Sequence, residues 1–102
     1  MEVWIGLVEV NPLPESTILG DGEGAFVHAL ALASSLREYE EAVKTALTED
    51  LLLGIEFQEV ELFSERAAKQ DVSERLKELA DETQLTGDVL FDDFHIYESF
   101  DA

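Results

Sequence analysis

The sequence predicts an α+β protein with a sheet of about four strands and two helices, in the order β-β-α-β-α-β. Segments rich in β-branched and aromatic residues indicate the strands, and two segments with apolar residues at helical spacing indicate the helices. The chain has 102 residues and is 46% hydrophobic. That is enough to bury one core without cysteine or metal crosslinks, so we expect a single α+β domain spanning 1–102.

The first two strands are predicted on either side of a long loop. Residues 3–10 favour a strand that stops before Pro12 and Pro14, because proline cannot donate a hydrogen bond to a ladder. Residues 11–24 contain several glycines and are predicted to form the loop. Residues 25–33 favour a second strand, although their run of alanine and leucine is also compatible with a helix.

A helix over 36–49 and a third strand over 51–63 follow. Ser35 and Glu38 have the spacing of a capping box, and apolar residues then recur at helical spacing. The alternation in 51–63 slips by one residue. A β-bulge near Gln58-Glu59, or two short strands, would account for that slip.

The last two predicted elements are a helix over most of 65–83 and a strand over 89–97. Asp71 and Glu74 resemble a second capping pair within the helix, and Gly87 turns the chain toward the strand. Together, these elements predict a sandwich of the broad ferredoxin-like kind. The resemblance is architectural, because the usual order in that fold is β-α-β-β-α-β.

The predicted strands carry apolar residues on both faces. Two short helices can cover one face of such a sheet, so a second apolar face predicts contact with a partner or a homodimer through the open face. The alternatives are that one helix lies on each face, or that the long loop covers part of the exposed side.

Charge is the strongest compositional feature. The chain has 24 Asp and Glu against 6 Lys and Arg, a formal net charge of -18, and all six basic residues lie within 37–77. Such a surface repels nucleic-acid phosphates and anionic lipid head groups, so neither nucleic acid nor membrane is an expected partner. A basic protein surface is the expected partner. The first residues lack the basic segment of a secretory signal, which predicts a cytoplasmic protein.

The two acidic ends of the chain predict the partner-binding surface. If residues 1–36 and 78–102 lie side by side, they form one acidic surface together with the aromatic residues of the last strand. The predicted partner-binding residues are Asp88, Phe91, Asp92, Asp93, His95, Tyr97 and Glu98.

A metal or acid-base site is the main chemical alternative. Asp93 and His95 project to one side of the predicted last strand, and His28 joins them if the strands pair. Two histidines and an acid would supply three ligands of a catalytic metal site. The three lack a recognised metal-ligand spacing, which favours a structural or interfacial role for both histidines, and the sequence predicts no catalytic residue and no cofactor.

Three functions are therefore compatible with the sequence. The first is a protein-binding module without enzymatic activity, such as an inhibitor or immunity-type protein that covers a basic partner surface. The second is a small metal-dependent enzyme or ligand-binding protein that uses Asp93, His95 and His28. The third is a domain whose acidic surface is an adaptation to a salty cytoplasm.

Overall fold

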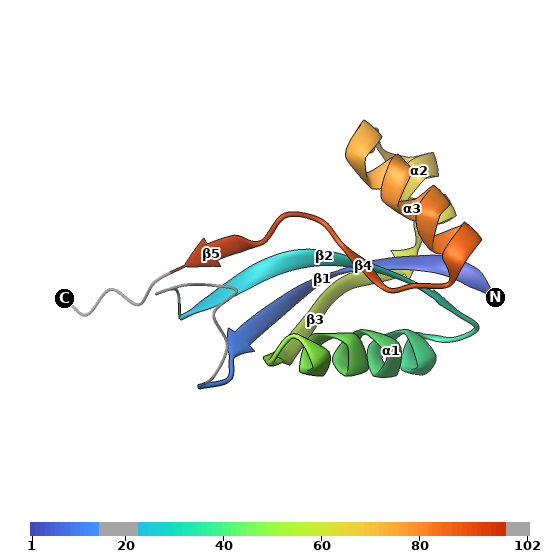
Figure 1. Cartoon of the computed structure of the whole chain (residues 1–102). Coiled ribbons are helices and arrows are strands. Elements are labelled where there is room, and N and C mark those ends of the chain that lie inside the picture. Colours follow the sequence, from blue (N-terminus) through green and yellow to red (C-terminus); the bar gives the residue numbers. More distant parts are fainter. Residues whose placement is uncertain (15–22, 98–102) are drawn as a thin grey trace.

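The computed structural model describes residues 1–14 and 23–97 and has an α+β fold (Figure 1). The class is as predicted, but the layout differs from the predicted one. Residues 15–22 of the predicted loop and residue Glu98 of the predicted partner surface lie outside the described residues. The elements are β1 (Glu2–Pro12), β2 (Gly24–Ala33), α1 (Leu36–Glu49), β3 (Leu52–Leu62), α2 (Phe63–Lys69), α3 (Glu74–Thr86), β4 (Leu90–Phe91) and β5 (His95–Tyr97).

The described strands form one five-stranded antiparallel sheet in the order β3-β1-β2-β4, with β5 also pairing with β2. The long hairpin of β1 and β2 forms its centre, and Val8 of β1 lies opposite Val27 of β2. Directly opposed residues point to the same side of a sheet. This register therefore fixes which side chains share each face.

Helix α1 covers one face, and its predicted bounds of 36–49 are confirmed. The Ser35 side chain accepts a hydrogen bond from the Glu38 N–H, as expected for a helix N-cap. The Glu38 carboxylate accepts from the backbone and side chain of Ser34 instead of from Ser35. Tyr39, Val43 and Leu47 are fully buried against the alanine-rich face of β2 and the valines of β1.

The predicted β-bulge in the third strand is confirmed. The β1–β3 register shifts between Ile5 and Leu7, and Glu59 at this point has a positive φ of 53°. The extra residue changes which positions face α1. Phe57 lies opposite Val8 before the bulge, and Leu62 lies opposite Trp4 after it.

The ferredoxin-like layout with two helices is wrong, because helices cover both faces. Figure 1 shows α1 on one side of the sheet and α2 with α3 on the other. There α3 contributes Leu79 and Ala80 to a second core cluster with Ile5 and Leu30. The predicted helix over 65–83 is two helices. The second begins at Glu74 and is capped by Ser73, whose side chain accepts from the Leu76 N–H, so Asp71 is not the cap.

The predicted last strand over 89–97 is interrupted. Phe91 pairs with Ala29, and His95 pairs with Phe26, so the register against β2 shifts by one residue between them. Residues 92–94 accommodate this shift outside the ladder. Phe91 and Phe94 instead pack together, 6.1 Å between ring centroids, against the α1-side core.

Leu51, at the C-terminal end of α1, provides a test of backbone strain. It has a φ of 59°, its side chain is 39% exposed, and its N–H donates to the Thr48 carbonyl. This position favours glycine. We expect Leu51→Gly to raise the free energy of unfolding by about 1 kcal/mol in urea denaturation.

The control is Leu53→Gly, which removes a second exposed leucine, this time within β3. It should lower stability by about 0.5–1 kcal/mol because glycine is unfavourable within a strand. Equal effects of the two substitutions would contradict the strain at Leu51.

Candidate functional site

Helices α2 and α3 cover only part of their face of the sheet. Ile5 and Leu30 are fully buried beneath them, whereas Leu7, Phe26 and His28 further along the same strands are half-buried. In Figure 1 both helices stand over the end of the sheet where β1 begins. We call the remaining area the open half-face. It consists of Leu7, Glu9, Asn11, Phe26, His28, Leu53, Glu56, Gln58, His95 and Tyr97.

A row of carboxylates and an aromatic ring crosses the open half-face. Glu9 of β1 lies opposite Glu56 of β3 on one side and opposite Phe26 of β2 on the other. Side chains in such directly opposed pairs lie about 5 Å apart at Cβ, where like charges repel. Glu56 is exposed and has no ion pair or hydrogen bond with the described residues. Glu9 and Glu56 therefore form a pair of neighbouring acids that has no basic partner among the described residues.

Tyr97 connects the C-terminal strand to β1 across β2. Its hydroxyl donates to the Glu9 carboxylate at 2.5 Å, and this bond, together with burial, raises the pKa of Tyr97 above its ordinary value. The ring lies over Gly24, where a Cβ atom would collide with the Tyr97 hydroxyl. The Glu23 N–H also donates to the Tyr97 carbonyl. The N-terminal and C-terminal segments therefore lie side by side at this end of the sheet.

A polar cleft of about 300 Å³ borders the open half-face beneath α2. Arg66 in its wall is only 6% exposed. Its Nε donates to the Glu61 carboxylate at 3.1 Å, and its Nη2 donates to the Glu59 carbonyl at 2.6 Å. The residues lining this α2 cleft are His28, Glu59, Glu61, Arg66, Lys69 and Gln70.

The charges of the α2 cleft are coupled. Lys69 donates to the second oxygen of Glu61 at 2.8 Å, and the hydrogen bonds from Lys69 and Arg66 hold the pKa of Glu61 below its usual value. Burial and the Arg66 charge lower the pKa of His28, while Asp92 and Glu59 act in the opposite direction. His28 is therefore shifted toward the neutral form, which is both a hydrogen-bond donor and an acceptor.

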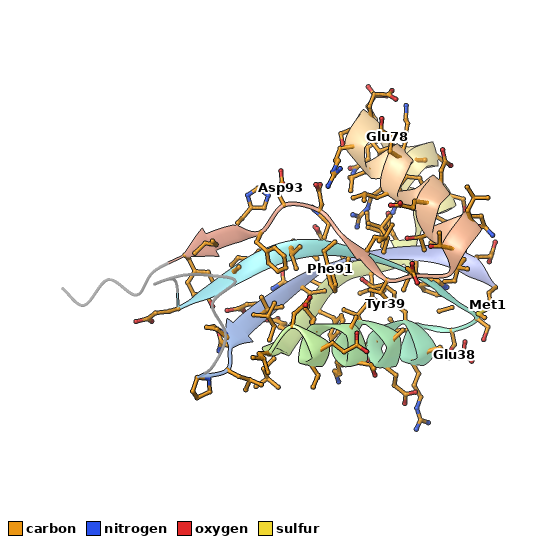
Figure 2. The ribbon with its side chains drawn as sticks, in the orientation of Figure 1. Met1, Glu38, Tyr39, Glu78, Phe91 and Asp93 are labelled. Atoms are coloured by element: carbon orange, nitrogen blue, oxygen red, sulfur yellow. The ribbon has the colours of Figure 1, made fainter. Side chains whose placement is uncertain are left out.

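The proposed metal candidates do not form a ligand set. His28 and His95 lie on the same face and interact electrostatically. Asp93 lies on the connection between β4 and β5, as Figure 2 shows, and not on a strand beside His95. Within residues 1–14 and 23–97, no group of three or more histidines and acids could hold a metal ion.

The structure separates most of the predicted partner-binding residues. His95 and Tyr97 belong to the open half-face, but Phe91 packs on the α1 side. Asp92 is paired with Arg75 at 3.6 Å, and its side chain is 22% exposed. Asp88 and Asp93 are both exposed. Asp88 lies next to Val89 and α1, and the open half-face contains neither residue.

Two parts of this site were missed by the sequence reasoning. Glu9 is the only charged residue within the predicted strand 3–10, and that isolated acid was the available signal. The burial of Arg66 depends on the bulge, because the bulge turns the Glu59 carbonyl toward the Arg66 side chain, which donates a hydrogen bond to it. No local pattern predicts that contact.

Comparisons with protein family models, with curated proteins and with solved structures find no match to this chain. Among the described helices, none is both long and apolar enough to cross a membrane.

Proposed function

We propose that this protein is a non-enzymatic protein-binding module that covers a basic surface of its partner through the open half-face. The observation that carries the proposal is the opposed pair Glu9 and Glu56 beside Phe26. A lysine or arginine of a partner placed between the two carboxylates would relieve their mutual repulsion. An inhibitor or immunity-type protein is the kind of module that uses such a surface.

The net charge of -18 supports the same proposal at longer range. A strongly charged protein attracts an oppositely charged partner before contact and accelerates association, and salt weakens this effect. Phe26 adds a ring on which the aliphatic part or the cation of a basic side chain can pack. Charge would thus guide the encounter, and the carboxylate and aromatic row would set the docking position.

A basic partner fits the open half-face better than a second copy of the chain. A two-fold dimer through this face would bring the carboxylates of Glu9 and Glu56 toward those of the other copy, which is unfavourable. The homodimer expected from the sequence remains an outcome of the test. A molecular mass of two chains in sedimentation, lost when a further acid is placed on this face in Phe26→Asp, would favour it over the basic partner.

The test is an NMR titration of the 15N-labelled protein with an oligolysine peptide at low and moderate salt. We expect the largest shifts at the open half-face. Glu9→Gln combined with Glu56→Gln should weaken binding at least about tenfold, because both carboxylates contact the peptide.

The matched control combines Glu49→Gln with Glu82→Gln, two exposed acids on α1 and α3. It removes the same charge, so it should weaken binding by no more than about twofold. Equal losses in the two double variants, or shifts spread evenly over all acidic surfaces, would overturn the proposal. Even spreading would instead favour an acidic surface that serves solubility in salt, the third function considered above.

A further inference from the structure

At the α2 cleft, two groups of opposite charge make no hydrogen bond or ion pair with the described residues: Arg66 Nη1 and the carboxylate of Glu59, which is an exposed residue. The hydrogen bonds of Arg66 to Glu61 and Glu59 use Nε and Nη2, and Nη1 makes none with the described residues. The Glu59 carboxylate likewise has no ion pair or hydrogen bond with residues 1–14 or 23–97. A buried guanidinium normally uses most of its donors, so an unused Nη1 beside a cleft is an available donor.

Glu59 is held at the cleft by a strained backbone. Its φ of 53° is unfavourable for a residue with a side chain, and the Arg66 bond to its carbonyl stabilises this conformation. Bulges commonly redirect a side chain next to a binding or catalytic site, and strained residues concentrate at such sites. The bulge thus places Glu59 in the lining of a cleft that also contains Arg66, Lys69 and His28, and the Glu59 charge is close enough to act on the pKa of His28.

We propose that the α2 cleft binds a small zwitterion of the α-amino acid class. The ligand carboxylate pairs with Arg66 Nη1, and its ammonium group pairs with the Glu59 carboxylate. The neutral imidazole of His28 and the amide of Gln70 supply further donors and acceptors to a polar side chain of the ligand.

Charge and size favour this ligand over a simple anion or cation. The lining contains two acids and two bases, and the whole chain carries a net charge of -18, which repels any anion. A zwitterion has no net charge and avoids that repulsion. A volume of about 300 Å³ lies at the small end of ligand sites, which matches a single amino acid.

The test is an NMR titration of the whole protein with each of the common free α-amino acids. At least one should shift the His28 ring signals and the amides of residues 59–70 in a saturable manner, with a dissociation constant in the millimolar range or below. The N-acetyl and carboxamide derivatives of the amino acid that binds each lack one charge and should bind at least about tenfold more weakly. If acetate alone gives saturable shifts with the same affinity as the amino acid, the proposal of a zwitterionic ligand is overturned. It is also overturned if no amino acid gives saturable shifts.

Variants identify the groups involved. Glu59→Gln should weaken binding at least about tenfold, while Glu56→Gln, on the same strand but outside the cleft, should not change it. Loss of Arg66 can unfold the protein, so Lys69→Gln is the second variant, with an expected loss of about threefold. An unchanged affinity in both Glu59→Gln and Lys69→Gln would contradict the proposed site. This outcome is independent of the oligolysine titration, whose variants lie outside the cleft.

Discussion

Tyr39→Ala is expected to lower the free energy of unfolding by about 4 kcal/mol, the largest effect of any single substitution proposed for this protein. Tyr39 is fully buried between α1 and the sheet (Figure 2). Its hydroxyl donates to the Ala29 carbonyl at 2.7 Å, and its ring packs edge-on against Phe57 at 6.0 Å. Alanine would remove the ring and leave a cavity in the middle of the α1-side core.

Tyr39→Phe separates the ring from the hydroxyl. It keeps the packing and removes one buried hydrogen bond, so it should cost about 1–2 kcal/mol. Urea denaturation followed by circular dichroism measures both variants. Leu85→Ala is the control, because Leu85 is 86% exposed and its removal should change stability by less than about 0.5 kcal/mol. A loss below about 2 kcal/mol for Tyr39→Ala would contradict this packing.

The sequence predicts the elements that are determined by residues close together in the chain. The cap at Ser35 and the helical spacing behind it define α1, and a slip in alternation reveals the bulge at Glu59. In each case the residues that determine the structure are near neighbours in the chain. The capping pattern at Asp71 is misleading because Ser73, two residues later, supplies the side chain that caps α3, while α2 has already ended at Lys69.

The layout depended on contacts between distant residues, which a single sequence does not show. The apolar residues on both sides of β1 were interpreted as an open face, but Ile5 and Leu30 are buried by Leu79 and Ala80 of α3. The interruption of the last strand arises from its register against β2. The candidate site follows from the same two facts, since the open half-face is the area that these helices leave uncovered.

The acidic pair and the α2 cleft show two different uses of charge on one sheet face. Among the residues that the structure describes, Glu9 and Glu56 have no basic partner, whereas Glu61 binds both Arg66 and Lys69. An internal ion pair satisfies its own charges, so it contributes little to attracting a partner. The two proposals therefore assign the uncompensated row to a basic partner surface and the α2 cleft to a ligand without net charge.

Gly6→Ala is expected to lower the free energy of unfolding by about 2 kcal/mol, because a methyl group has no space at this position. A Cβ atom on Gly6 would lie 2.7 Å from the Val60 side chain and 2.8 Å from the Tyr39 hydroxyl. Gly6 pairs with Ala29, whose carbonyl receives the Tyr39 hydrogen bond. The missing side chain of Gly6 is therefore what allows Tyr39 to reach β2.

A double-mutant cycle tests whether the collision with Val60 contributes to this loss. In a Val60→Ala background, Gly6→Ala should cost at least about 1 kcal/mol less than in the natural chain, because one of the two collisions is gone. Gly54→Ala is the matched control. It also faces α1, but its nearest contact is Leu47 at 3.1 Å, so a small shift of that side chain accommodates the methyl group. Its cost should stay below about 1 kcal/mol, since alanine is also the better strand residue. Additive effects of Gly6→Ala and Val60→Ala would show that the two positions do not compete for this space and would contradict the steric cause of the loss.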